Sequence, residues 1–430
     1  MQRPWETIIM KAINTIFLEA LRASLTADQV TWTRDKVSAE DLSALINIAS
    51  IHHVVPMIFE AIYSCDAFQA LHPQQVMGLR RSVMQSIMMQ TMKTEEFKSL
   101  FGKLTAAGIK PCVVKGVICR GLYPSPDARS SGDEDVLIRP EDFQKVHELF
   151  LEHGMTLMEP EQDIYEAHEV PYIQPNGPLY IELHKALFPP TSEAYGDMNK
   201  FFADVHDRVT EVTVGDGTFY SMCPTDHLLY LICHSFKHFL HSGFGIRQVC
   251  DIILFANAYG KEIDWTYVLE SCREIRADLF AASMFKMGEK YLVFDPEKAC
   301  YPEVWRSIDV DETAMLDDLL ESGVFGQSNM SRKHSSNITL NAVIADKRGE
   351  KAKSGKIRSA IKAVCLPVDK LSGRFTYLKK MPFLLPVAWI QRLWIYKKET
   401  AGKQASNNAA DSIKIGNERI ELMRKYGIIK

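Results

Sequence analysis

The sequence lacks the long apolar runs that membrane-spanning helices require. Nowhere in its 430 residues is there an uncharged apolar stretch of the roughly 18 residues that a spanning helix needs. The first six residues, Met-Gln-Arg-Pro-Trp-Glu, lack the basic-then-apolar order of a secretory signal. The nine cysteines are odd in number and include no Cys-x-x-Cys, which favours buried reduced thiols over a disulfide framework. These absences favour a soluble protein in the cytoplasm.

Positive charge is scarce in most of the chain and concentrated near its end. The formal net charge is −4, yet residues 347–398 carry 14 Lys or Arg against 2 Asp or Glu, a local charge of +12. Residues 399–430 add +2, so the first 346 residues sum to −18. An acidic body with a basic tail disfavours broad nucleic-acid binding by the body, so the sequence carries no strong nucleic-acid signal.

A chain of this length is expected to form two or three domains, and its apolar periodicity divides it into four parts. Helical spacing dominates the N-terminal part, where Ser38 is a predicted N-cap. The methionines Met84, Met88, Met89 and Met92 recur on one stripe there, which we interpret as adaptable core packing. The expected fold is α+β, with a mixed sheet and flanking helices between helical N-terminal and C-terminal regions. The predicted parts are a helical N-terminal region 1–95, an α/β domain 96–222, a helical domain 223–330 and a basic tail 331–430 with amphipathic helices.

The α/β part contains an Asp-x-Asp pair at the start of a predicted strand, 133–138. Alternate side chains of a strand share a face, so Asp133 and Asp135 should point one way and Glu134 the other. Two carboxylates close together in a low dielectric repel each other, and a bound Mg²⁺ or Mn²⁺ would remove that repulsion. Upstream, Lys115-Gly116 joins a predicted strand, 110–114, to a short helix, a junction that can receive a phosphate.

Two further strands are predicted at 170–174 and 179–187, on either side of the turn Pro175-Asn176-Gly177-Pro178. Along the second strand, Glu182 and His184 share a face, and Glu182 is the natural third acid beside Asp133 and Asp135. Another pair of strands is expected near 209–214 and 218–221.

The following helix carries four histidines on one stripe: His227, His234, His238 and His241. We interpret them as polar or substrate-facing groups, because a zinc site usually draws its ligands from more than one element. Arg247 and Asp251 lie one turn apart on the next helix, an ordinary surface pair by default.

Together these residues resemble a known family. The order Lys-Gly-x12-Arg-x3-Asp-x-Asp, from Lys115 to Asp135, resembles the nucleotidyltransferase superfamily with the DNA polymerase β-type fold. It resembles more closely the bacterial group of uncharacterised nucleotidyltransferase family proteins, in which Lys-Gly replaces the superfamily's Gly-Ser. Further similarity lies in Ile181–His184, in His234-x2-Lys237-His238, in Arg247-x3-Asp251, and in the C-terminal runs 374–380 and 389–392.

The resemblance implies transfer of a nucleoside monophosphate from an NTP such as ATP to an acceptor hydroxyl. By family analogy, Asp133, Asp135 and Glu182 would be catalytic and would hold Mg²⁺ or Mn²⁺. Lys115, Gly116 and Arg129 would bind the nucleotide. The expected substrate-facing residues are His184, Lys237, His238, Arg247 and Asp251.

Two other functions stay open at this point. One is a catalytically inactive nucleotide-binding regulator, which retention of the three acids disfavours. The other is a peripheral membrane protein serving cell-envelope polysaccharide assembly, anchored through the basic tail. In that tail, the apolar run 384–390 is too short to span a bilayer, but it is flanked by Lys379-Lys380 and Arg392. With Trp389 and Trp394, this pattern is typical of interfacial helices. Packing of this segment back onto the acidic body is the favoured alternative.

Overall fold

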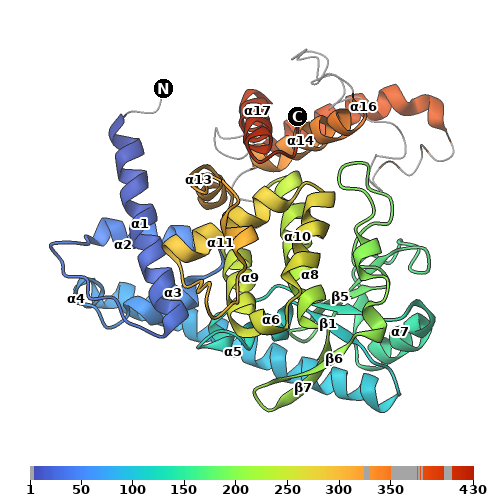
Figure 1. Cartoon of the computed structure of the whole chain (residues 1–430), viewed down its shortest axis with the longest axis horizontal. Coiled ribbons are helices and arrows are strands. Elements are labelled where there is room, and N and C mark those ends of the chain that lie inside the picture. Colours follow the sequence, from blue (N-terminus) through green and yellow to red (C-terminus); the bar gives the residue numbers. More distant parts are fainter. Residues whose placement is uncertain (1–3, 324–329, 350–374, 376–377, 379–380, 401–408) are drawn as a thin grey trace.

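A seven-stranded mixed sheet lies at one end of the molecule, with helices on both of its faces (Figure 1). The computed structural model describes residues 4–323, 330–349, 375, 378, 381–400 and 409–430. The strand order is β3-β4-β5-β2-β1-β7-β6. The strands are β1 (Cys112–Val114), β2 (Glu134–Leu137), β3 (Thr156–Leu157), β4 (Glu169–Ile173), β5 (Tyr180–His184), β6 (Thr210–Val214) and β7 (Gly217–Ser221). The expected fold class, α+β, is confirmed.

The centre of the sheet is formed by strands that lie far apart in the sequence. Strand β2 pairs antiparallel with β1 and parallel with β5, in a register that places Asp135 opposite Glu182. Strands β4 and β5 form the predicted antiparallel hairpin, and β6 and β7 form the second predicted pair. The local alternation predicted from the sequence therefore holds in the main strands.

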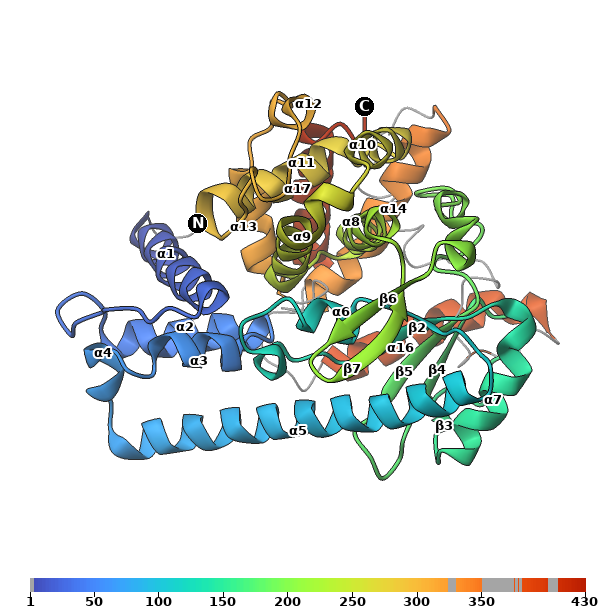
Figure 2. The same ribbon diagram turned by 60° about the horizontal axis from the view of Figure 1, so that its bottom comes forward.

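Each face of the sheet has its own apolar cluster. Val136, Ile181 and Leu183 belong to the cluster that includes Phe97, Leu100 and Phe101 of the long helix α5 (Pro73–Ala106). On the other face, Val114 and Leu137 join the larger cluster formed with the central helices. Figure 2 shows α5 crossing beneath the sheet, with α7 (Phe143–Glu152) beyond it. Since neighbouring residues of a strand point to opposite faces, Glu134 must face α5 while Asp135 faces the central helices.

The N-terminal helices form a layer that meets the first half of α5. They are α1 (Pro4–Thr26), α2 (Ala39–Ile51), α3 (Val55–Ile62) and α4 (Asp66–Gln69). Ser38 caps α2 as predicted: its hydroxyl accepts a hydrogen bond from the Asp41 amide, and Asp41 accepts one from the Ser38 amide. Helix α5 continues without a break through residue 95, the boundary predicted between the first two parts.

The interpretation of the methionine stripe as core packing was wrong. Met84, Met88, Met89 and Met92 are all exposed. The reason is their position around α5: at 3.6 residues per turn they lie on the side of the helix opposite the buried Val83, Gln90 and Phe97. Only the side bearing Val83, Phe97 and Leu100 is covered.

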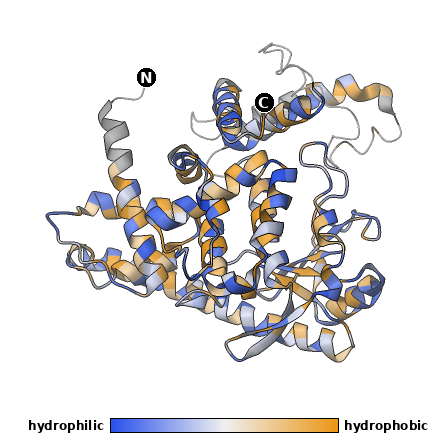
Figure 3. Cartoon of the chain, in the orientation of Figure 1, coloured by the Kyte–Doolittle hydropathy of each residue, from blue (hydrophilic) through white to orange (hydrophobic). Residues whose placement is uncertain are grey.

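The helical half packs on the Asp135 face of the sheet. Figure 3 shows its hydrophobic residues concentrated in the central helices. The helices are α8 (Pro224–His241), α9 (Ile246–Tyr259), α10 (Trp265–Glu274), α11 (Asp278–Tyr291), α12 (Glu303–Arg306) and α13 (Thr313–Ser322). The short helix α6 (Gly116–Arg120) follows β1, and its Val117 and Ile118 belong to the cluster on the other, α5-covered face. Buried aromatic residues such as Phe236, Phe239 and Phe280 stack between α8 and α11.

The described residues of the basic C-terminal part include the helices α14 (Met330–Lys347), α16 (Leu385–Thr400) and α17 (Ala409–Lys425). Helix α17 packs against α14, and Arg419 reaches the end of α8, where it donates to the backbone carbonyls of Phe239 and His241. Across the described parts of the chain, no helix is both long enough and apolar enough to cross a bilayer.

Candidate metal and nucleotide site

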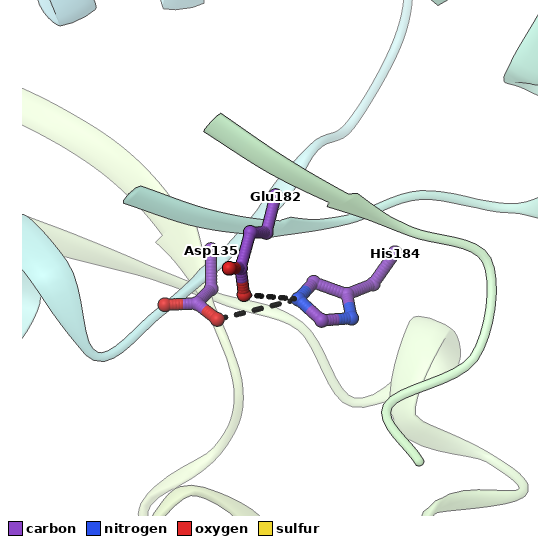
Figure 4. A group of neighbouring side chains, drawn as sticks. All are labelled: Asp135, Glu182 and His184. Atoms are coloured by element: carbon purple, nitrogen blue, oxygen red, sulfur yellow. Dashed lines mark hydrogen bonds and ion pairs between the residues drawn. The ribbon is translucent and has the colours of Figure 1, made fainter. Parts of the chain in front are cut away.

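Asp135, Glu182 and His184 converge on the face of the sheet that meets α8 (Figure 4). His184 Nε2 lies 3.2 Å from Asp135 Oδ1 and 4.0 Å from Glu182 Oε2. One ligand atom from each residue can be chosen so that all lie within 4.8 Å of one another, and no second group of this kind occurs among the described residues. The parallel pairing of β2 and β5 produces this convergence, because it sets Asp135 beside Glu182 and His184 two residues further on.

The chemistry of this group fits a divalent cation. Two carboxylates and an imidazole are ligands that Mn²⁺ and other first-row ions accept, and the carboxylates also suit Mg²⁺. Asp135 Oδ2 and His184 Nδ1 are buried without a hydrogen-bond partner. Lys115 Nζ lies 3.0 Å from that Oδ2 atom, an ion-pair distance without hydrogen-bond geometry. A bound cation would compensate Asp135 Oδ2, whereas His184 Nδ1 lies on the other side of the ring, 3.8 Å from Glu169 Oε2.

The pKa values of the two acids of the group are shifted in opposite directions. Burial alone would raise the pKa of Asp135, but Lys115 and His184 hold that pKa well below its usual range. Burial, followed by the charges of Asp135 and Asp133, raises the pKa of Glu182 to about 7. For His184, burial acts to lower the pKa, but the hydrogen bond and charge of Asp135 raise it overall. Glu182 is thus the acid that carries the like-charge repulsion of the site.

Asp133 stands one residue before β2, half-buried, and outside the Asp135–Glu182–His184 group. Its charge still raises the pKa of Glu182, so it lies within electrostatic range of the site. Its role as a metal ligand stays a prediction. The sequence did indicate that His184 lies near Glu182, since the two residues alternate along one strand. His184 was expected to face the substrate, however, and not to belong to the group of possible metal ligands.

Lys115 is held beside the carboxylates in a strained backbone conformation. Its φ of 56° and ψ of −125° lie in a region that residues with a side chain rarely adopt. Its amide donates to His227 Nε2 at 3.2 Å. The other ring nitrogen of His227 lies 3.2 Å from Ser221 Oγ, whose hydroxyl donates to the carbonyl of Val113. This chain of bonds assigns the Nδ1–H tautomer to His227, and burial lowers its pKa to about 3, so the ring is neutral.

The Lys115 ammonium is shared between the sheet and α8. Nζ lies 3.0 Å from Asp135 Oδ2 and 3.0 Å from His234 Nε2. Burial opposes the charge, but Asp135 raises the pKa of Lys115 well above its usual range, so the amine is a cation. The predicted nucleotide-binding lysine is therefore next to the acids.

On the opposite face of β2, Glu134 binds the N-terminus of α6. Its Oε2 accepts the amide of Val117 at 2.9 Å, and its Oε1 accepts Arg120 Nη1 at 2.7 Å. Gly116 has a φ of +37°, and a Cβ there would lie 2.0 Å from Glu134 Oε2. Because Glu134 already uses the Val117 amide, that donor is not available to a phosphate. The buried Glu134–Arg120 ion pair was not predicted from the sequence, because no local pattern distinguishes Arg120 from an ordinary surface cation.

Arg129 forms a buried pair with Asp251. Its Nε lies 2.8 Å from Asp251 Oδ1, and its Nη2 contacts Oδ2. Tyr123 donates to the same carboxylate at 2.7 Å. The expectation that Arg247 and Asp251 form a surface pair was wrong: Asp251 is buried and bound to Arg129, while Arg247 donates to the carbonyl of Ser130. These contacts tie the loop before β2 to α9, and the predicted nucleotide contact of Arg129 stays a prediction.

The α8 side of the site carries the expected histidines. His234 Nε2 lies 3.2 Å from His238 Nε2, and Gln248 lies 3.3 Å from His234 Nδ1. Burial, then the charge of Lys115, lowers the pKa of His234 well below its usual value. Burial also lowers the pKa of Lys237, whose amine lies 6.0 Å from the ring of Phe188. Polar groups from α8 therefore lie next to the acids of the sheet, and their contacts with a substrate stay a prediction.

A mixed sheet with paired carboxylates on adjacent strands, next to a Lys-Gly junction, is the architecture of a nucleotidyltransferase domain. The chain belongs to the family described as uncharacterised nucleotidyltransferases, whose family model matches residues 38–292, more than half of its length. The resemblance inferred from Lys115-Gly116 and Asp133-x-Asp135 is thus confirmed at the level of the family. A search of curated proteins found no match.

Proposed function

We propose that this protein is a metal-dependent nucleotidyltransferase that moves a nucleoside monophosphate from an NTP to an acceptor hydroxyl and releases pyrophosphate. The observation that carries the proposal is the convergence of Asp135, Glu182 and His184 beside the ammonium of Lys115. Acids that bind a cation, next to a cation that can bind phosphate, are the two charge types that phosphoryl transfer needs.

In this proposal Asp135 and Glu182, with His184 and with Asp133 at the edge of the site, would hold Mg²⁺ or Mn²⁺. The ion, when bound, would neutralise phosphate charge and lower the pKa of the acceptor hydroxyl. Without the ion, His184 Nε2 would orient Asp135, from which it lies 3.2 Å, and the ion would replace that contact when it binds.

Lys115 would act on the nucleotide. Its ammonium pairs with Asp135 in the free chain and would contact the triphosphate when an NTP binds, stabilising the leaving pyrophosphate. The strained backbone at Lys115, anchored by His227, would keep the amine aimed at the site. Lys237 and His238 of α8 would contribute to acceptor or nucleotide binding. ATP as the donor and a cytoplasmic location, where NTPs are supplied, belong to the same proposal.

The test is transfer of label from each of the four α-³²P-labelled NTPs, with Mg²⁺ or Mn²⁺ and a cell extract as the source of acceptors. We expect label to appear in an acid-stable product with the native chain, and not with Asp135→Asn. Pyrophosphate release, measured in parallel, distinguishes transfer from retention of bound nucleotide.

The second candidate is a regulator that binds an NTP without transferring it. It is favoured by one observation, the Lys115–Asp135 pair, which satisfies the acid with the chain's own cation. Saturable NTP binding without labelled product or pyrophosphate, under every metal and NTP tested, would support the regulator and reject the transferase.

A further inference from the structure

Helix α16 and the short turn before it (Pro382–Leu384) carry apolar side chains on two different sides. On one side, Ala388 is fully buried and packs with Phe375 and Leu378, with Leu384 and Leu385 at the edge. This small cluster is separate from both cores of the body. The cluster therefore covers only one side of α16.

The other side consists of large exposed hydrophobic residues, Phe383, Val387, Ile390 and Trp394, which we call the outer face. Phe383, Ile390 and Trp394 are 74%, 67% and 63% exposed. Spacings of three and four residues place Val387, Ile390 and Trp394 along one stripe of α16, and Phe383 lies in the turn just before it. Figure 1 shows α16 at the outer edge of the molecule, and Figure 3 shows hydrophobic residues along it. Contiguous exposed apolar residues of this size mark interaction surfaces.

The charge of the sequence that contains α16 indicates what covers the outer face. The stretch 347–398, which includes α16, carries +12, with Lys379-Lys380 just before the helix and Lys397-Lys398 near its end. A basic segment with a Trp-containing apolar stripe suits the interface of an anionic bilayer, where the rings enter the headgroup region and the cations meet lipid phosphates. A second copy of the same face would bring two segments of +12 together, which disfavours self-association.

We propose that the outer face of α16 binds the surface of an anionic lipid bilayer. The helix would lie in the plane of the interface, since none of the described helices is able to cross a membrane. The first 346 residues, at −18, would be repelled by the same surface, so attachment would occur through the C-terminal part alone. The proposal does not depend on nucleotidyl transfer.

The test is co-sedimentation of the full chain with vesicles of phosphatidylcholine alone and of phosphatidylcholine mixed with phosphatidylglycerol. We expect binding to the anionic vesicles that weakens as salt is added. The triple variant Phe383→Ser, Ile390→Ser, Trp394→Ser should lose at least about tenfold in partitioning, since each removes apolar area from the interface. The variant Lys379→Glu, Lys380→Glu, which lowers the charge of residues 347–398 from +12 to +8, should bind anionic vesicles more weakly than the native chain does.

The matched control is Met84→Ser, Met88→Ser, Met92→Ser on α5, which removes three exposed apolar side chains from another surface. It should bind vesicles as the native chain does, and circular dichroism should show all variants folded. Absence of native-chain binding to anionic vesicles would overturn the proposal, as would an equal loss in the α5 control. A dimer seen by light scattering without lipid, and abolished by the α16 variant, would instead identify the outer face as a self-association surface.

Discussion

Lys115 and Asp135 face each other across the β1–β2 pair, with Nζ 3.0 Å from Oδ2. The ammonium stands next to the carboxylates on which a divalent cation would bind. The free chain thus balances Asp135 with a cation of its own, while Glu182 is left with a raised pKa. This relationship leads to direct predictions about metal affinity and stability.

Lys115→Met should tighten Mn²⁺ binding by about tenfold, because removing a competing positive charge near the carboxylates is equivalent to roughly one pKa unit of interaction. The same substitution should weaken NTP binding. Mn²⁺ titration followed by electron paramagnetic resonance measures the first effect without any turnover. Lys98→Met, which removes a lysine paired with Asp216 on the surface, serves as the control. An unchanged Mn²⁺ affinity in Lys115→Met would show that the ammonium does not compete with the ion.

Asp135→Asn should abolish transfer and lower the stability of the metal-free chain by about 3 kcal/mol, since it leaves the buried Lys115 charge without its partner. Urea unfolding in EDTA measures the loss, and Asp216→Asn, at an exposed carboxylate, is the control. A metal-free variant as stable as the native chain would show that the Lys115–Asp135 pair contributes little to the fold.

Glu182 should make the stability of the metal-free chain depend on pH. Its pKa rises from 4.5 to about 7 on folding, so the folded state binds the proton more tightly. The stabilisation is complete below pH 4.5 and is lost as the pH rises through 7. After allowance for solvent screening the effect is roughly 2 kcal/mol.

Glu182→Gln should remove this component of the pH dependence and stabilise the chain at pH 8. Urea unfolding from pH 4 to pH 8 in EDTA, on the native chain and on the variant, provides the comparison. Parallel curves for the two proteins would contradict the assignment of the repulsion to Glu182.

Gly116→Ala should destabilise the fold by about 2–4 kcal/mol, because the added methyl group meets a buried carboxylate at a backbone conformation that disfavours side chains. A Cβ at Gly116 lies 2.0 Å from Glu134 Oε2, whereas a Cβ at Gly78 of α5 has nothing within 4 Å. Gly78→Ala is therefore the control, and it should be stabilising by up to about 1 kcal/mol. Similar unfolding midpoints for the two variants would argue against the close approach of Glu134 to α6.

Arg129→Ala should lower stability by about 3–5 kcal/mol, because it leaves the buried Asp251 carboxylate unpaired. The exposed pair Arg139–Asp207 provides the comparison, and Arg139→Ala should change stability by less than about 1 kcal/mol. NTP affinity, measured where the Arg129 variant remains folded, separates the structural role from the predicted clamp. A large loss of NTP affinity with little loss of stability would identify Arg129 as a nucleotide-binding residue.

The sequence alone determined the local geometry of the site. Strand alternation places Glu182 and His184 on one face of β5 and separates Asp135 from Glu134 on β2, because successive side chains of an extended chain point to opposite sides. Ser38 was predictable as an N-cap because capping is also local: its hydroxyl accepts a hydrogen bond from the amide of Asp41, three residues along the chain. The Lys115-Gly116 and Asp133-x-Asp135 pattern was enough to indicate the family.

Only the tertiary structure decided which charges pair. Arg129 and Asp251 are 122 positions apart, and Lys115 and His234 are 119 apart, so no local period connects them. The parallel pairing of β2 with β5 set Asp135 beside Glu182. The exposure of the α5 methionines likewise depended on which side of the helix the rest of the chain covers. Covalent geometry sets the direction of each side chain along its own element, whereas long-range packing sets what that side chain meets.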